Sequence, residues 1–522
     1  MHEVELVLAL LIVLSVVATL AQPLRIPYPI LLVLVGLGLG LIPQMPSVEL
    51  EPDLVFLLFL PPLLYFAAFN TSIREVRAEL RPILSLAVGL VLATTAAVAV
   101  IAHALIPELD WPTAFVLGAI VSPPDAVAAT SIFRGLGVPR RLVTVLEGES
   151  LFNDATALVA YRAALAITAT ATFSFWTTGV RFLAVGAGGV LVGLVAGYAI
   201  AWLRRRLDDP PVEIAISLLT PFAAYVPAEW LHVSGVLAAV TAGMYVGRQA
   251  PYIMTPETRI RGRAVWDMVV FVMNGLVFIL IGLQLPGILS ELSSRSTLSL
   301  AGLGVTMSLV VILVRFAWLA GDSLLKRAMR RTSSADDHPP AWPEVIVAGW
   351  AGMRGVVSLA AALALPAGTP ERDLVIFLTF CVILATLVGQ GLSLPWLIHA
   401  FGVADDGAGV EQERVARSSA TDAAVLRIEQ LALEWPDHSP LIESLRLQYA
   451  HRVSHFEEVA ASRDGASGTA EQEMLEHSLI RRAVIDTERA IVLELRDRGE
   501  ISDEVRRRIE RDLDLDELRV DA

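Results

Sequence analysis

The sequence predicts an all-α polytopic membrane protein with about 13 transmembrane helices and a helical tail. Hydrophobic residues make up 55% of the 522 residues and charged residues only 18%, whereas about a quarter of the residues in a soluble domain are charged. The mean hydropathy is +0.62. Residues 403–522 hold 28 acidic and 16 basic residues, but residues 1–402 hold 26 and 24. The chain is therefore divided into a transmembrane domain, 1–402, and an acidic tail, 403–522.

Thirteen apolar runs have about the length of a membrane-spanning helix, which needs roughly 20 mostly apolar residues. They cover residues 4–21, 27–43, 53–69, 82–107, 112–131, 142–167, 179–203, 212–230, 232–247, 265–285, 298–324, 343–366 and 372–400. The loops after odd-numbered runs hold 18 Arg and Lys residues, and the other loops at most 3. The positive-inside rule then places the N-terminus outside the cell and the tail in the cytoplasm. The odd count also suits two six-span inverted repeats around a linking span.

The tail is predicted to be helical and soluble. Helical periodicity covers residues 416–434 and 471–498, and Ser502 is placed to cap a last helix. The acidic charge excludes nucleic acid as a partner, because phosphate binding needs basic surface. A glycine-rich nucleotide motif is absent from the tail sequence, so we interpret it as a regulatory or dimer-forming module, or as a passive extension.

A double proline interrupts the fifth predicted span beside a carboxylate. Pro123 and Pro124 remove two backbone donors, so a regular helix cannot continue through them. Non-helical backbone at membrane depth is tolerated only where it faces protein or a water-filled cavity. The freed carbonyls and Asp125 together offer oxygen ligands for a hard monovalent cation. The alternative is a proline kink with a hydrogen-bonded Asp125.

The sixth predicted span carries a dense group of polar residues. A spacing of four places Ser150 and Asp154 on one face of a helix, and Glu149 and Asn153 on the adjacent face. Charges inside a span cost about 2.5–3.5 kcal/mol each on insertion scales, so they need a functional or structural reason. A carboxylate such as Asp154, removed from water, holds either a proton or a cation. That competition is a simple chemical basis for exchanging one for the other.

An arginine inside a span needs a carboxylate partner, and the twelfth predicted span contains one. Arg354 lies in the run GMRG at 352–355, whose small residues allow helices to approach closely. Glu149 is its expected partner, which leaves Asp154 free for transport. Arg315 in the eleventh span is a second such arginine, either paired inside the protein or extended to the cytoplasmic interface.

These segments resemble the signatures of the NhaP/NHE-type sodium/proton antiporters. The matching segments are residues 122–127, 147–156 and 352–355, with 60–65 as weaker support. The resemblance covers most of residues 1–402. It implies a thirteen-helix fold in which two interrupted helices cross near the membrane midplane, one of them broken at Pro123 and Pro124. It also implies a homodimer, which we place in a bacterial plasma membrane.

The same resemblance implies sodium/proton exchange by alternating access and assigns roles to single residues. The implied Na⁺ ligands are Asp154, Asp125 and Ser150, the proton binds at Asp154, and Glu149 with Arg354 forms a core ion pair. Asn153 beside Asp154 is typical of electroneutral one-for-one exchangers. Pro124 stands where many members have Thr, so one hydroxyl ligand is missing. The ions are transported rather than resident, and no cofactor is implied.

Other readings remain open at this point. Carboxylate and carbonyl oxygens suit Na⁺, K⁺ and Li⁺, so a K⁺/H⁺ antiporter of the same fold is an alternative. An ion channel would usually need a selectivity ring built from several subunits. An intramembrane hydrolase is disfavoured, because residues 148–150 do not form a G-x-S-x-G elbow and the sixth span has no histidine.

Overall fold

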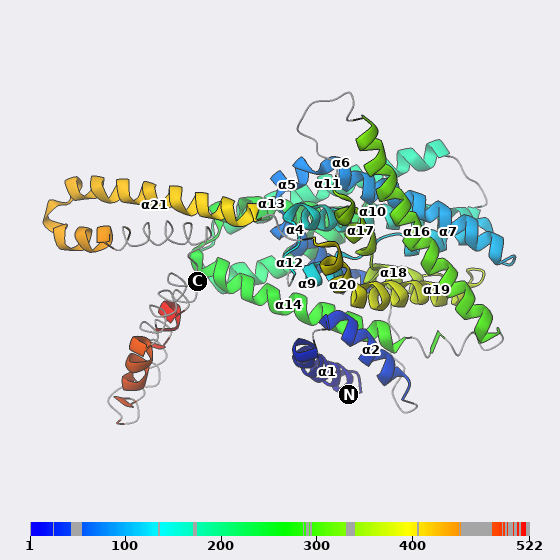
Figure 1. Cartoon of the computed structure of the whole chain (residues 1–522), viewed down its shortest axis with the longest axis horizontal. Helices are drawn as coiled ribbons and strands as arrows, with labels where there is room; N and C mark the ends of the chain where they lie inside the picture. Colours follow the sequence, from blue (N-terminus) through cyan, green and yellow to red (C-terminus); the bar gives the residue numbers. More distant parts are fainter. Residues whose placement is uncertain are drawn as a thin grey trace. The chain divides into compact units, whose positions relative to one another are not determined.

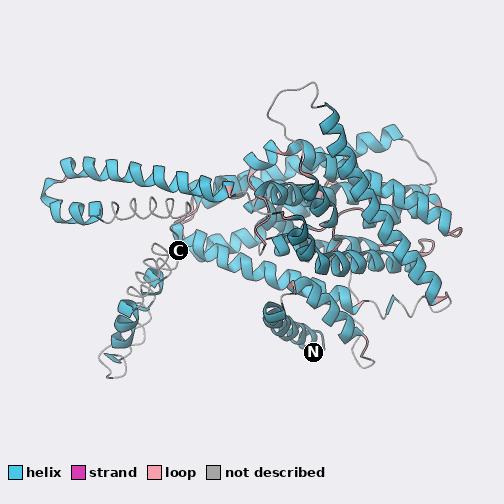
Figure 2. Ribbon diagram, viewed as in Figure 1, coloured by secondary structure: helices cyan, strands magenta, loops and turns pink. Residues whose placement is uncertain are grey.

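The described part of the chain consists of helices and the loops between them (Figure 2). The computed structural model describes residues 2–24, 26–42, 55–133, 136–170, 175–284, 287–288, 292, 295–329, 340–403, 407–447, 449, 483–492, 494–495, 498, 505, 509–510 and 513–517. The chain divides into two compact units, Met1–Asp405 and Asp406–Ala522.

The first unit has the composition of a polytopic membrane protein, as predicted. Six of its described helical segments are long and apolar enough to cross a membrane: Leu80–Leu105, Gly179–Arg204, Pro210–Trp230, Pro256–Leu283, Thr297–Ala328 and Arg372–Phe401. Shorter apolar helices cover Glu5–Ala21, Tyr28–Gly40, Leu57–Asn70 and Trp111–Val121. The count of thirteen spans and the inverted repeat stay predictions.

The helices follow the predicted runs in order along the chain. The first part contains α1 (His2–Leu24), α2 (Tyr28–Gly40), η1 (Val55–Phe59), α4 (Leu60–Asn70), α5 (Ile73–Ala78), α6 (Leu80–Leu84), η2 (Ser85–Leu90), α7 (Val91–Leu105), α8 (Trp111–Val121), α9 (Ala126–Phe133) and α10 (Arg140–Thr170). The second part contains α11 (Phe175–Arg204), α12 (Pro210–Trp230), α13 (Gly235–Ile253), α14 (Pro256–Leu283), α16 (Thr297–Met329), α17 (Trp342–Trp350), α18 (Val356–Leu363), α19 (Arg372–Leu384), η3 (Ala385–Gln390) and α20 (Gly391–Phe401). The elements η1, η2 and η3 are π-helical turns within longer helical segments.

Local sequence explains where several helices begin and end. The Asp110 side chain caps α8 by accepting the Thr113 N–H at 3.0 Å, and Thr255 caps α14 in the same way, because the first N–H groups of a helix lack helical partners. At the other end of the unit, α20 stops at Gly402, whose φ of 61° is a left-handed value that glycine adopts without strain.

The contacts between the helices of the first unit divide them into two groups, and Figure 1 labels most of the helices in each. The scaffold group contains α1, α2, α4 and α11–α14, with α13 packed against α4 and α11, and α14 packed against α2. The crossover group contains α6–α10 and α16–α20, with α8 packed against α7 and α10, and α16 packed against α7, α17 and α19. In the scaffold group, α13 approaches α4 so closely at Gly247 that a Cβ there would overlap the Phe69 carbonyl.

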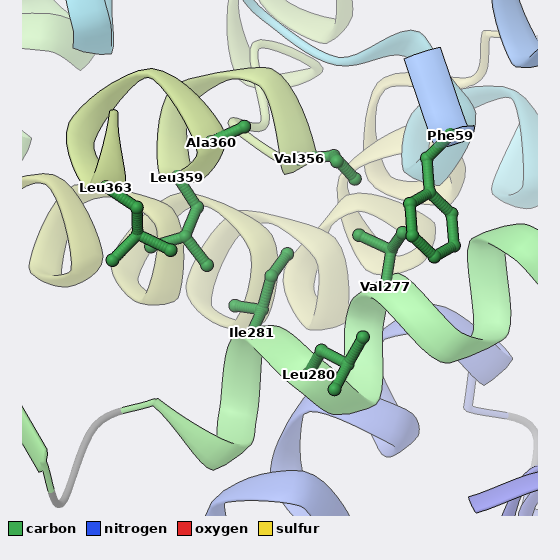
Figure 3. Close-up of a pocket in the computed structure, with 8 residues that line it drawn as sticks. All are labelled: Phe59, Val277, Leu280, Ile281, Val356, Leu359, Ala360 and Leu363. Carbon is green, nitrogen blue, oxygen red and sulfur yellow. The ribbon is translucent and has the colours of Figure 1, made fainter. Parts of the chain in front are cut away.

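The seam between the two groups is apolar on both sides of the crossover group. Leu151 and Ala155 of α10 belong to one buried cluster with Leu64 of α4 and Val240 of α13. On the other side, α18 faces α14 and Phe59, as Figure 3 shows for Val356, Leu359, Ala360 and Leu363 opposite Val277, Leu280 and Ile281. These side chains leave a space of about 10 Å³, at the lower limit of what one water molecule needs. The seam therefore has room for at most about one water molecule at this point.

The second unit begins with α21 (Ala408–Glu434), which includes the helix predicted at 416–434, and continues with the short η4 (Pro436–His438). Of the helix predicted at 471–498, the longest described piece is 483–492, and it is helical. Arg489 in this piece pairs with Asp514 at 2.8 Å and Glu517 at 2.7 Å. The predicted cap Ser502 lies outside the described residues.

A buried ion pair joins three helices of the scaffold group. Arg204 at the end of α11 pairs with Glu213 in the first turn of α12 at 3.3 Å, and each side chain is 1% exposed. The Thr258 hydroxyl of α14 donates to the other Glu213 oxygen at 3.4 Å. The sequence count treated Arg204 as a loop charge; the structure instead buries it. Removing one member of a buried pair leaves the other charge without compensation.

We therefore expect Glu213→Ala to lower the free energy of unfolding by about 3–5 kcal/mol. Asp267→Ala is the matched control, because the Asp267 side chain is 60% exposed and sits 3.9 Å from Arg263, and exposed pairs contribute about 0–1 kcal/mol. Melting of both variants in detergent measures the difference. Equal shifts in the two variants would show that the Arg204–Glu213 pair does not stabilise the fold.

Candidate cation site

Two interrupted helices meet inside the crossover group. The first break separates α8 from α9 at residues 122–125 and falls on Pro123 and Pro124, as predicted. The second break separates α17 from α18 at residues 351–355. The Asp125 N–H donates to the Met353 carbonyl at 2.7 Å, so the two breaks are hydrogen-bonded to each other.

The Asp125 carboxylate lies at the N-termini of two short helices. Its Oδ1 accepts the Val127 N–H of α9 at 2.8 Å, and the N–H of Val356, the first residue of α18, also faces the carboxylate. The N-terminus of a helix carries a partial positive charge and unpaired N–H groups. One carboxylate therefore satisfies both helix starts, and its backbone is fixed by the bond to Met353.

Arg354 has the complementary position at the C-terminal ends of the other two half-helices. Its Nε donates to the Val121 carbonyl at the end of α8 at 2.9 Å, and its Nη1 donates to the Gly352 carbonyl after α17 at 2.6 Å. Its backbone N–H donates to the Thr386 hydroxyl in the π-helical turn η3 at 3.0 Å. Carbonyls at the end of a helix carry partial negative charge, which this guanidinium neutralises.

The core ion pair is not the one that the sequence predicted. Glu149 pairs with Arg315, through Nη1 to Oε1 at 2.5 Å and Nη2 to Oε2 at 2.8 Å, and both side chains are 1% exposed. The Arg315 Nε also donates to the Ala348 carbonyl of α17 at 3.1 Å, so Arg315 does not extend to the interface. Arg354 does not form this fork with Glu149 in the structure, because its Nε and Nη1 donate to carbonyls of the two breaks.

Asn153 links α10 to the first break. Its Nδ2 donates at 2.8 Å to the carbonyl of Pro124, which lies in the non-helical segment between α8 and α9. Its Oδ1 is buried and has no hydrogen-bond partner in the described structure. A carboxylate could not donate this bond, so an amide at this position is chemically specific. The unpaired Oδ1 remains as an oxygen beside Asp154.

Asp154 is held differently from the other acids of the site. Its side chain is only 6% exposed, and no hydrogen bond or ion pair to the described residues fixes its carboxylate. Asp125 is close enough for the two charges to interact. Ser150 lies one turn earlier on the same face of α10, as predicted. The structure thus brings Asn153 and Asp154 of α10 to the first break, whereas Ser150 is placed there only by helical spacing.

Three contacts of this site were missed by the sequence reasoning. Thr386 supports the second break, and Arg372 donates to the Leu365 and Leu363 carbonyls at 2.9 and 3.2 Å, at the C-terminal end of α18. Gly355 lies against Asp125, where a Cβ would overlap Oδ2. Of these residues, only Gly355 could have been noticed in the sequence, because it directly follows Arg354 within a predicted span.

The fold agrees with comparisons to known proteins. The model of the family described as "Sodium/hydrogen exchanger, transmembrane" matches residues 8–400 of the chain. The chain belongs to this family. The matched region includes both breaks and all of α10, and the family is one of transporters.

Relatives of this exchanger cover most of its length. A protein of Mycobacterium tuberculosis named as an uncharacterised Na⁺/H⁺ exchanger is 35% identical over 99% of this chain and 97% of its own. A sodium, potassium, lithium and rubidium/H⁺ antiporter of Bacillus pumilus is 34% identical over 75% of this chain and 61% of its own. The solved structure of the sodium proton antiporter MjNhaP1 from Methanocaldococcus jannaschii shows the same fold, with a TM-score of 0.57, 20% identity and coverage of 76% and 98%.

The corrected ion pair predicts a specific pattern of coupling. Arg315→Met should lower the free energy of unfolding by about 3–5 kcal/mol, because it leaves Glu149 buried without a partner. Adding Glu149→Gln should recover a large part of that loss. Arg354→Met is the matched control, and adding Glu149→Gln to it should recover little. Melting of these four variants and of Glu149→Gln alone in detergent measures both couplings, and a larger coupling for Glu149 with Arg354 would restore the pair first predicted.

Gly355→Ala should reduce exchange at least tenfold without unfolding the protein, because its methyl group displaces the Asp125 carboxylate. Gly389→Ala is the control, since no atom lies within 4 Å of the Cβ it would add. Flux into proteoliposomes and the melting temperature are measured for both. Full exchange by Gly355→Ala would show that the position of the Asp125 carboxylate is not critical.

Proposed function

We propose that this exchanger moves Na⁺ and H⁺ in opposite directions, one for one, across a bacterial plasma membrane by alternating access. Asp154 binds either ion, and the exchange serves sodium and pH homeostasis. The chain acts as a transporter without enzymatic activity or cofactor. The relatives named as Na⁺/H⁺ exchangers and the family to which the chain belongs support the identity of the two ions.

The state of the Asp154 carboxylate carries this proposal. Glu149 is neutralised by the Arg315 fork, and Asp125 by two helix N-termini. Asp154 has neither kind of partner among the described residues, although it is buried. A buried carboxylate without compensation takes up a positive charge from outside. A proton and a monovalent cation such as Na⁺ both supply that charge, and each excludes the other.

The buried charges support a one-for-one stoichiometry. The buried charged side chains of the described residues are Glu149, Asp154, Glu213, Arg204, Arg315 and Arg354, which sum to zero. Asp125, which is half-buried and lies at the break beside α10, adds one negative charge to this set. One proton or one Na⁺ therefore balances the seven charges of this set. Asn153 contributes no charge, so a second proton has no acceptor at that position.

The ligand set suits a hard monovalent cation. Asp154, Asp125 and Ser150 supply carboxylate and hydroxyl oxygens, and the buried, unpaired Oδ1 of Asn153 belongs to the residue next to Asp154 in α10. Oxygen ligands of this kind are those that hard cations prefer. Pro124 offers only its carbonyl, which Asn153 already occupies, so the hydroxyl that Thr would supply is missing here.

The arrangement of the helices supports alternating access. Asp154 lies on α10, which packs against α4 and α13 of the scaffold group through an apolar cluster. Because the seam has few directional contacts, the crossover group can shift against the scaffold group. The arginine and lysine bias of the loops supports an outside N-terminus and a cytoplasmic tail. The exposed apolar side chains Leu183, Leu191 and Val195 of α11 suit the lipid bilayer or a second copy in a homodimer.

K⁺ is the second candidate cation. The Bacillus pumilus relative is named for sodium, potassium, lithium and rubidium, so the same fold accommodates larger ions. Carboxylate and hydroxyl ligands do not by themselves reject K⁺ or Li⁺. A K⁺/H⁺ antiporter would use the same Asp154 and the same charge balance.

Asp154→Asn should abolish exchange while the protein keeps its melting temperature, because an amide binds neither a proton nor a cation strongly. The measurement is proton movement in proteoliposomes with a pH dye after Na⁺, K⁺ or Li⁺ is added, with the membrane potential clamped or free. Asp322→Asn is the control, because Asp322 pairs with Lys326 at 2.7 Å and both side chains are 30% exposed. Exchange that persists in Asp154→Asn would remove its role, and wild-type flux that depends on the potential would contradict one-for-one exchange.

A further inference from the structure

An ion pair crosses the apolar seam between the two helix groups. Arg162 of α10, in the crossover group, donates from Nη2 to the Glu229 Oε2 of α12, in the scaffold group, at 2.9 Å. The side chains are 52% and 30% exposed. The pair therefore lies at the rim of the seam, whereas the contacts deeper in the seam are apolar.

Glu229 is fixed to the scaffold group independently of Arg162. Its Oε1 accepts the N–H of Gly235, the first residue of α13, at 3.3 Å. Ser234 just before it caps α13 through the Leu237 N–H at 3.2 Å. The carboxylate thus has one oxygen on its own group and the other on Arg162. Glu229 Oε2 is therefore a fixed hydrogen-bond acceptor for Arg162 of α10, the helix that also contains Asp154.

Arg162 and Asp154 move together when α10 moves. Both residues lie on α10, eight residues apart, which is about 12 Å along the helix axis. α10 is a single helix over this stretch, so Arg162 moves with the carboxylate. The loop pattern predicts that the Arg162 end of α10 faces outside the cell.

The two kinds of contact respond differently when α10 shifts against α12. Apolar contacts have no preferred direction, so side chains can slide and find new neighbours. A hydrogen-bonded ion pair has a fixed distance and angle, and it is lost when the two groups separate by a few ångströms. Any movement that opens the seam at this end must therefore break the Arg162–Glu229 pair.

We propose that Arg162 and Glu229 form a releasable latch that closes the seam at the predicted outer end and opens each time the site turns outward. This proposal rests on the alternating exchange proposed above. Exposed ion pairs shift an equilibrium by about two- to five-fold. Such a latch biases the closed state and still allows it to open in every cycle.

Reversible cross-linking of the pair tests the latch directly. Arg162→Cys and Glu229→Cys are combined in a Cys381→Ser background, because Cys381 is the single cysteine of the sequence. A bis-methanethiosulfonate reagent links the two thiols, and a reductant cleaves the link. We expect cross-linking to stop Na⁺/H⁺ exchange in proteoliposomes and reductant to restore it. Exchange that continues in fully linked protein would overturn the proposal.

Arg295 and Glu371 provide the matched control for cross-linking. They also pair at 2.9 Å, with both side chains 29% exposed, but they lie just before α16 and α19 of the crossover group. Linking Arg295→Cys to Glu371→Cys should leave exchange within about twofold of the unlinked protein. Arrest by this link as well would mean that cross-linking blocks exchange generally, and the latch would lose its support.

Charge reversal gives a second test that does not depend on cysteine variants. Arg162→Glu places two carboxylates together and should change the apparent affinity for external Na⁺ by about two- to five-fold. Adding Glu229→Arg should return it to the wild-type value. An unchanged affinity in the single variant, or no recovery in the double variant, would overturn the latch. Absence of exchange in the wild-type protein would instead contradict the proposed function.

Discussion

The site depends on one crossing of the chain, where the Asp125 N–H meets the Met353 carbonyl at 2.7 Å. Four half-helix ends converge there, and each would carry uncompensated partial charge in a medium that offers no water. Asp125 neutralises the starts of α9 and α18, and Arg354 neutralises the ends of α8 and α17. Two opposite charges therefore hold four helix ends, and both side chains are fixed in place by these bonds. The geometry of α10 beside this crossing follows from it, through Asn153 and the Pro124 carbonyl.

The three acids near the crossing are chemically similar but have different surroundings. Glu149 is fixed by a two-pronged guanidinium, Asp125 by backbone N–H groups, and Asp154 by no described donor. Structural charge and transport charge are thus carried by different side chains. In the proposed cycle, this separation lets an ion leave Asp154 without disturbing the crossing, because the bonds that hold the half-helices are not broken. If one carboxylate both held the half-helices and bound the ion, its protonation would weaken the fold.

The sequence was sufficient for the parts of this site that depend on local chemistry. The first break was predictable because Pro123 and Pro124 cannot continue a helix, and the Ser150–Asp154 face because helical spacing fixes it. The second break has no proline within it, so only the glycines beside Arg354 hinted at it. The partner of Glu149 was predicted wrongly because two arginines on different helices were candidates, and spacing along the chain does not say which one reaches α10. The same reason hid the Arg204–Glu213 pair, since burial of a residue at the end of a span is decided by its neighbours in space.

The apolar seam explains why exchange can be obligatory in the proposed cycle. With Asp125 and Asp154 both ionised, the interior has a net charge of one negative unit, and moving such a charge past apolar side chains costs about 2.5–3.5 kcal/mol on insertion scales. That difference slows the empty exchanger by about a hundredfold relative to a neutral one, since 1.4 kcal/mol is a factor of ten in rate. A proton or a Na⁺ ion on Asp154 removes the charge, so either loaded form crosses readily. Because the two ions cannot share the carboxylate, each passage in one direction carries one of them and the return carries the other. Coupling of Na⁺ to H⁺ movement then requires no gate that senses the ion. It requires only a buried acid without a partner and apolar side chains past which its charge moves slowly.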